Sequence, residues 1–169
     1  MNEQAQAVFD FWFRPGPGQP ADAPRREWFQ KDDAFDREIS RRFGALIDQA
    51  LAGGLLEWDA EGPQSQLARI LLLDQFTRNV HRGTPRAFAG DAAALRAAQA
   101  MVDAGQDVAL PPLQRAFVYL PFEHAEDMGM QSWPWRCTRR WKTKNAMWYP
   151  RPPSRASPAR SITRSATAR

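Results

Sequence analysis

The stretch LARILLLDQFTRNVHRGTPRAFAGD, residues 67–91, decides the fold that this sequence predicts. Its apolar side chains cover most of a helix circumference: Leu67, Ile70, Leu71, Leu72, Leu73 and Phe76. A helix that is apolar nearly all round is buried in the centre of a domain. We expect it to open near Pro63, where a missing N–H costs little, and to end before the Arg82–Pro85 turn.

Amphipathic helices are predicted on both sides of this central helix. The first covers Asn2–Phe13, and the second follows the capping residues Asp32 and Asp33 and stops at Gly53. A third runs from Asp91 to Gly105, and a fourth opens at Pro111-Pro112, with Pro121 starting or kinking the last segment. No convincing strand is present. The predicted class is all-α, an antiparallel helical bundle or helix-hairpin array of five or six helices.

An acid and a base lie on the predicted buried face of the central helix. At about 100° per residue, Asp74 and Arg78 both extend the apolar stripe that starts at Leu67. Buried charges must be paired, because desolvating either one alone costs several kcal/mol. Asn79, Arg82 and Arg86 follow at the same end.

A second polar cluster, YLPFEHAED at residues 119–127, supplies Glu123, His124 and Asp127. Two interpretations remain open. In the first, both clusters form a structural ion-pair network. In the second, arginines hold an anionic ligand while Glu123 or His124 acts as acid or base. No metal is expected, because the spacing of Glu123, His124 and Asp127 is not that of a helical metal motif.

Four motifs together resemble the bacterial family called domain of unknown function 924. They are FDFWF at 9–13, WFQKDDAFD at 28–36, residues 67–91 and YLPFEHAED. The resemblance implies an all-α fold similar to tetratricopeptide-like folds, and no established activity. It implies signature positions at Asp74, Gln75, Arg78, Asn79, Arg82, Phe88, Asp91, Pro121, His124, Glu126 and Asp127. Thr77 stands where the family usually has proline, and no RFGRFPHRN-like C-terminal segment is present.

The charge changes abruptly near residue 131. Residues 1–131 hold 13 Lys and Arg against 19 Asp and Glu, whereas residues 132–169 hold ten basic residues, four tryptophans and no acid. We predict a C-terminally incomplete helical domain over 1–131. The tail, 132–169, is interpreted as a frameshift product, since shifted codons permit a helix-like peptide. We expect it to be disordered from about Pro150, and nucleic-acid binding by it is the less favoured alternative.

The functional expectation is a cytoplasmic, non-enzymatic binding module that takes a peptide or a small anionic ligand and uses no cofactor. No apolar run of membrane-spanning length and no signal peptide are present. The alternative is a small-molecule enzyme built on the Arg, Asp and His cluster. The ligand candidates are Asp74, Arg78, Asn79, Arg82, Arg86, Glu123, His124 and Asp127. An open pocket at these residues would favour a ligand site, and a sealed cluster would favour the structural network.

Overall fold

The structure, a computed structural model, describes residues 1–20 and 22–125, and these residues are helical with no β-strand among them. The α-helices are α1 Glu3–Phe13, α2 Asp33–Leu51, α3 Pro63–Leu71, α4 Thr77–Val80, α5 Asp91–Asp103 and α6 Pro112–His124. Short 3₁₀ turns cover Arg26–Trp28, Leu56–Asp59, Pro85–Phe88 and Gln106–Ala109, and a π segment covers Leu72–Phe76. The predicted all-α class is confirmed.

The helix ends lie where the capping residues predicted them. Asn2 accepts from the backbone N–H of Ala5 (2.8 Å) at the start of α1, and Asp32 accepts from two first-turn N–H groups of α2. Helix α2 ends at Leu51 and is followed by Gly53 with φ 86°; the Gly54 N–H donates to the Gln49 carbonyl (2.9 Å), the bond that defines a Schellman motif. These local bonds fix the length of each helix before tertiary packing is considered.

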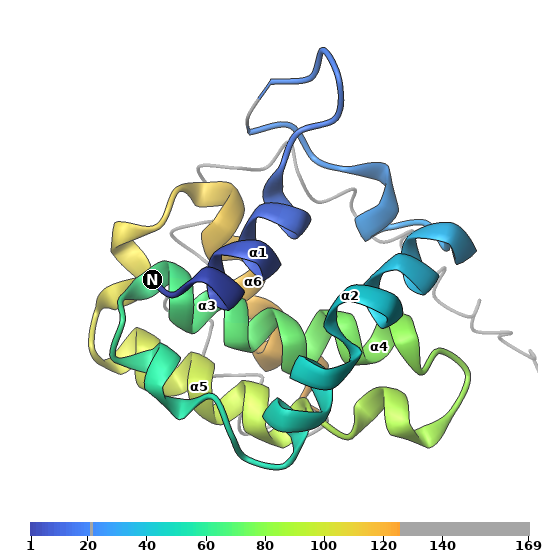
Figure 1. Cartoon of the computed structure of the whole chain (residues 1–169). Coiled ribbons are helices and arrows are strands. Elements are labelled where there is room, and N and C mark those ends of the chain that lie inside the picture. Colours follow the sequence, from blue (N-terminus) through green and yellow to red (C-terminus); the bar gives the residue numbers. More distant parts are fainter. Residues whose placement is uncertain (21, 126–169) are drawn as a thin grey trace, which may run out of the picture.

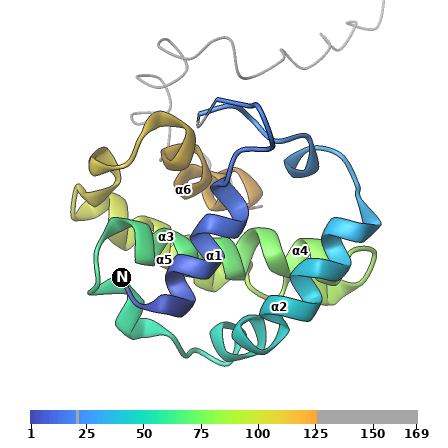
Figure 2. The ribbon, with the colours of Figure 1, turned by 45° about the horizontal axis from the view of Figure 1, so that its top comes forward.

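The continuous run α3–π segment–α4 forms the centre of the molecule. Helix α3 contacts α1, α5 and α6, and the π segment and α4 contact α2. Figures 1 and 2 show α1 crossing α3 and α2 lying beside α4. The apolar side chains of the run are fully buried, as the sequence predicted: Leu67, Ile70, Leu71, Leu72, Leu73 and Phe76.

The central helix is not uniformly α-helical, in contrast to the prediction. Between Leu72 and Phe76 it widens to i→i+5 bonding, and the Thr77 N–H donates to the Leu72 carbonyl. The buried Thr77 hydroxyl donates to the same oxygen (2.8 Å). A π segment takes more residues per turn than an α-helix, so residues after it do not continue the 100° phase. Thr77 is the first residue of α4, which continues the helix to Val80.

Aromatic residues of α1 fill the space around the central run. Trp12 is fully buried and packs against Phe76 with ring centroids 5.3 Å apart. Trp58 is also fully buried, whereas Trp28 is only partly buried. The Trp28 ring stacks on Trp12 at 5.9 Å, and its Nε1 donates to the Trp12 carbonyl (3.2 Å). One edge of the aromatic core thus reaches the molecular surface at Trp28.

Helix α6 runs through Pro121 to His124, so Pro121 does not start a new segment. The apolar side chains of α6 differ in exposure: Phe117 is buried, whereas Leu113, Ala116 and Leu120 are partly exposed. The predictions for Asp127, for the domain boundary at 131 and for the tail lie outside the described residues. No helix in the described part of the chain is long and apolar enough to cross a membrane.

Candidate functional site

Asp74 is the buried centre of the polar cluster. Its side chain is 1% exposed, and its Oδ1 lies 2.7 Å from Nδ1 of His124 at the end of α6. Its Oδ2 accepts from the Gln75 amide, and Nε of Arg78 lies 3.6 Å from Oδ1. An ionised carboxylate can only accept hydrogen bonds, so the geometry assigns the proton to Nδ1 of His124.

Arg78 makes its direct hydrogen bond to Asp91 rather than to Asp74. Its Nη2 lies 2.8 Å from Asp91 Oδ2, and its guanidinium lies 5.0 Å from the centroid of the Phe88 ring. The expected i,i+4 pair with Asp74 is long because the π segment shifts the phase between the two residues. Arg78 is therefore held from three elements, with 22% of its side chain exposed.

Burial raises the pKa of the Asp91 carboxyl above its ordinary value, and the nearby Asp74 charge acts in the same direction. The Arg78 guanidinium opposes this rise in the pKa. The Asp91 Oδ1 atom is buried and has no hydrogen-bond partner among the described residues. Asp91 is thus a partly desolvated carboxylate whose second oxygen is not satisfied by the described part of the protein.

Asn79 and Arg82 converge on one carboxylate of α2. Asn79 Nδ2 donates to Asp36 Oδ1 (2.7 Å), and Arg82 Nε donates to Asp36 Oδ2 (3.1 Å). The Arg82 side chain remains 42% exposed. Arg86 pairs instead with Asp48 (2.7 Å) on an exposed surface.

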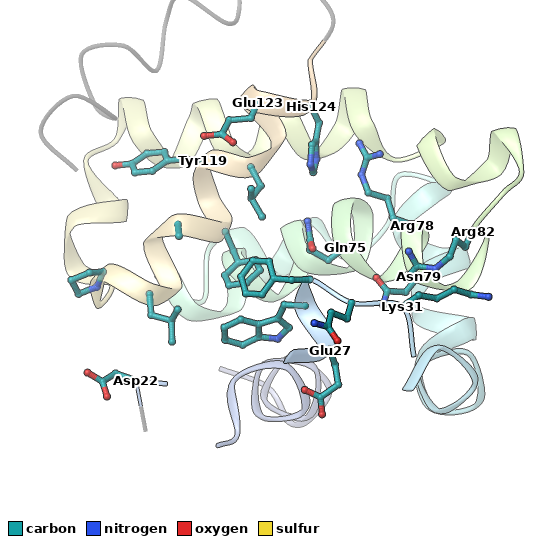
Figure 3. A pocket seen from close by; sticks show the side chains of 18 of the residues that line it. Asp22, Glu27, Lys31, Gln75, Arg78, Asn79, Arg82, Tyr119, Glu123 and His124 are labelled. Carbon is teal, nitrogen blue, oxygen red and sulfur yellow. The ribbon is translucent and has the colours of Figure 1, made fainter. Parts of the chain in front are cut away.

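A pocket of about 650 Å³, here called the α6 pocket, opens between α6, the Trp28–Lys31 segment and α4. Its apolar wall consists of Trp28, Phe29, Pro111, Pro112, Leu113, Ala116, Phe117 and Leu120. Its polar lining consists of Asp22, Glu27, Gln30, Lys31, Gln75, Arg78, Asn79, Arg82, Tyr119, Glu123 and His124. Figure 3 shows Lys31, Arg78, Asn79 and Arg82 gathered on one side of the pocket and Asp22 on the other.

A second pocket of about 470 Å³, here called the Phe88 pocket, shares two residues with the first. Arg78 and His124 line both pockets. Phe88, Asp91, Ala92, Leu95, Pro121 and Ala125 complete its lining. The two shared side chains thus stand between an amphipathic cavity and a smaller, more apolar one.

The structure brings most of the predicted candidates together. Asp74, Arg78 and His124 form one network, Asn79 and Arg82 border the same pocket, and Glu123 also lines it. Arg86 does not reach the pocket, and Asp127 lies outside the described residues. No group of three or more potential metal ligands lies within residues 1–20 and 22–125.

Three contributors to the site were missed as site residues. Asp36, Lys31 and Trp28 lie within the 28–36 motif, but none of them was predicted to line a site. Their approach to α4 and α6 depends on tertiary packing, which has no local sequence signal. Asp91 stood among the signature positions that the resemblance implied, and this was the available indication of a role beyond opening α5.

The profile of the bacterial family of proteins of unknown function DUF924 matches residues 8–161. Because the match covers most of the chain, this protein belongs to that family, as its motifs indicated. A solved structure of a protein of unknown function from Agrobacterium tumefaciens is similar, with 37% identity and a TM-score of 0.67. That similarity covers 86% of this chain and 74% of the other. No curated protein matches this sequence.

Proposed function

We propose that this protein binds a small amphipathic anion, with its charged group beside Arg82 and its apolar part along α6. The observation that carries this proposal is the division of the α6 pocket into a polar end and an apolar wall. Pockets that bind small molecules combine mostly apolar walls with a few placed polar groups. A volume of about 650 Å³ accommodates a molecule of metabolite size.

The apolar wall supports the proposal because covering its exposed apolar surface with a ligand is favourable in free energy. Phe29 is largely exposed, and Leu113, Ala116 and Leu120 are partly exposed along one side of α6. Burying apolar surface contributes about 25 cal/mol per Å². An aliphatic chain of several carbons laid against this wall would therefore supply a large part of the binding free energy.

The polar end supports a preference for anions. Arg82 pairs with Asp36 of α2, which it shares with Asn79, and 42% of its side chain stays exposed. An exposed ion pair contributes at most about 1 kcal/mol, so the pair with Asp36 does not hold this guanidinium tightly. A ligand carboxylate can therefore replace the water around it at small cost. Lys31 pairs with Asp33 at 2.9 Å, but both side chains are largely exposed. Of the acidic lining residues Asp22, Glu27 and Glu123, Asp22 lies on the opposite side (Figure 3).

Octanoate is the probe for this proposal, and its binding is measured by calorimetry and by tryptophan fluorescence. We expect octanoate to bind more tightly than 1-octanol or octylamine of equal chain length, and acetate not to bind. Arg82→Gln should weaken octanoate binding about tenfold or more, since a charge-assisted hydrogen bond contributes about 1.5–3 kcal/mol. The near-ultraviolet dichroism of Arg82→Gln should stay that of the wild type.

Arg86→Gln is the matched control, because Arg86 also pairs with an aspartate of α2 but does not line the pocket. Its octanoate affinity should equal that of the wild type. Equal affinities for octanoate and octylamine, or equal losses in Arg82→Gln and Arg86→Gln, would overturn the proposal. Unfolding of Arg82→Gln would instead support the purely structural network.

A further inference from the structure

The Asp74–His124 pair has a geometry that a structural ion pair does not require. Asp74 is almost completely buried, whereas His124 keeps 29% of its side chain exposed and lines both pockets. Asp74 comes from the π segment and His124 from the end of α6, 50 residues later. A carboxylate fixed in the interior thus orients an imidazole at the cavity wall.

The contact to Asp74 selects one tautomer of the imidazole. With the proton on Nδ1 donated to Asp74, Nε2 of neutral His124 carries the lone pair. Among the described residues Nε2 has no hydrogen-bond partner, and it is not a fully buried orphan atom. The basic nitrogen therefore remains accessible to a molecule in the cavities.

The surroundings supply the other groups that acyl hydrolysis needs. Arg78 lines the same two pockets, and its Nη2 and Nε face Asp91 and Asp74, which leaves Nη1 for a further acceptor. The apolar wall of α6 offers a surface for an acyl chain. No serine, cysteine or threonine stands among the described residues that line either pocket, and we take water as the nucleophile.

We propose that the α6 pocket hydrolyses esters of medium-chain carboxylic acids, with His124 as general base and Asp74 as its positioning residue. Nε2 of His124 removes a proton from water while the water oxygen bonds to the ester carbonyl carbon. The carbonyl electron pair moves onto its oxygen, beside the Arg78 guanidinium. The carbonyl then re-forms, the bond to the alcohol oxygen breaks, and the imidazolium returns the proton to that oxygen.

The products are a carboxylic acid and an alcohol, so ester and water balance them without any other reactant. This inference rests on the proposed function, because the carboxylic acid released, once it has lost its proton to solvent, is the amphipathic anion that Arg82 holds. A carboxylate that stabilises the imidazolium and fixes its tautomer is the arrangement by which histidine serves as a base in hydrolases. General-base catalysis of this kind contributes about 10²–10⁴-fold to the rate.

The test is the hydrolysis of p-nitrophenyl octanoate and p-nitrophenyl acetate by the full chain. The chain contains two histidines, His81 and His124, and His81 lines neither pocket. His124→Asn keeps an amide N–H for Asp74 and removes the base, so kcat/KM for the octanoate ester should fall about 100-fold or more. His81→Asn should leave it unchanged, and the acetate ester should be a poorer substrate of the wild type.

Asp74→Asn separates positioning from binding. It should lower kcat with little change in KM, because the tautomer changes but the acyl wall does not. If Asp74→Asn fails to fold, the comparison of His124→Asn with His81→Asn decides. Equal rates for those two variants, or no turnover by the wild type, would overturn hydrolysis.

Octanoate binding, measured separately, distinguishes the two proposals. Binding that depends on Arg82, together with turnover that does not depend on His124, removes the activity and leaves the binding function. Turnover that depends on His124 without inhibition by octanoate would retain the catalytic base and overturn the proposed position of the anion at Arg82.

Discussion

A Cβ atom added to Gly90 would lie 2.0 Å from the carbonyl oxygen of Leu73. This close approach lets the residue before α5 pack directly on the π segment, and it places Asp91 within reach of Arg78. The backbone at Gly90 is ordinary, so space rather than torsion demands glycine. The site therefore depends on a contact between two main chains.

Gly90→Ala should destabilise the protein by about 2–3 kcal/mol, since backbone cannot move aside as a side chain can. Gly44→Ala is the control, because it is a helical glycine of α2 whose added Cβ meets nothing within 4 Å. That change should stabilise the protein by about 0.5–1 kcal/mol. Urea unfolding of both variants measures the two effects, and equal behaviour would contradict the steric argument.

Thr77→Val removes the buried hydroxyl that donates to the Leu72 carbonyl while keeping the side-chain shape. We expect a loss of about 1–2 kcal/mol, the cost of a missing buried hydrogen bond. Thr84→Val removes a similar bond, to the His81 carbonyl, at an exposed position, and it should change stability much less. A stability of Thr77→Val equal to that of the wild type would show that the main-chain bond alone maintains the π segment.

The His81 imidazole gives a stability that depends on pH. Burial lowers the pKa of the His81 imidazole below its ordinary value of 6.5, and the Arg86 charge lowers it further. Between the folded and the unfolded pKa the unfolded state binds more protons, so this stabilising contribution is present above pH 6.5 and is lost as the pH falls through 6.5 toward the lower folded pKa. His81→Gln should therefore flatten the decline of stability below neutral pH, as followed by urea midpoints between about pH 7.5 and 5.

Asp59→Asn should be costly because Arg69 is buried. Arg69 Nε and Nη2 lie 2.8 and 2.5 Å from the two carboxylate oxygens of Asp59, and the arginine side chain is 7% exposed. Leaving a buried guanidinium without its carboxylate costs about 3 kcal/mol. Asp48→Asn, which breaks the exposed pair with Arg86, should cost less than about 1 kcal/mol. Thermal unfolding of the two variants decides, and similar melting temperatures would contradict this ranking.

The sequence predicted the helices well because caps and apolar spacing are local signals. Asp32, Gly53 and the apolar run from Leu67 each specify their own segment of backbone, and the structure has helix ends or burial at all of them. It also indicated that Asp74 would be buried, since the residue extends an apolar stripe.

The partners within the site were harder to predict. A uniform advance of about 100° per residue predicts a pair between Asp74 and Arg78. The π segment shifts that phase, so the shorter contact of Asp74 is to His124 and the shorter contact of Arg78 is to Asp91. The pairing of Arg82 with Asp36 and of Arg86 with Asp48 depends on how α2 packs beside α4. Such long-range distances are set by the whole core, and residue spacing within one helix does not contain them.

Trp28 joins the wall of the α6 pocket to the main chain of α1 through its bond to the Trp12 carbonyl. A molecule seated against that indole would hold the first and last described helices in register, so occupancy would raise the melting temperature of the entire domain in proportion to the logarithm of ligand concentration. The same indole is one of the seven tryptophans of the chain. Its emission would change when the cavity is filled, so tryptophan fluorescence would detect binding in a screen of metabolites without a label.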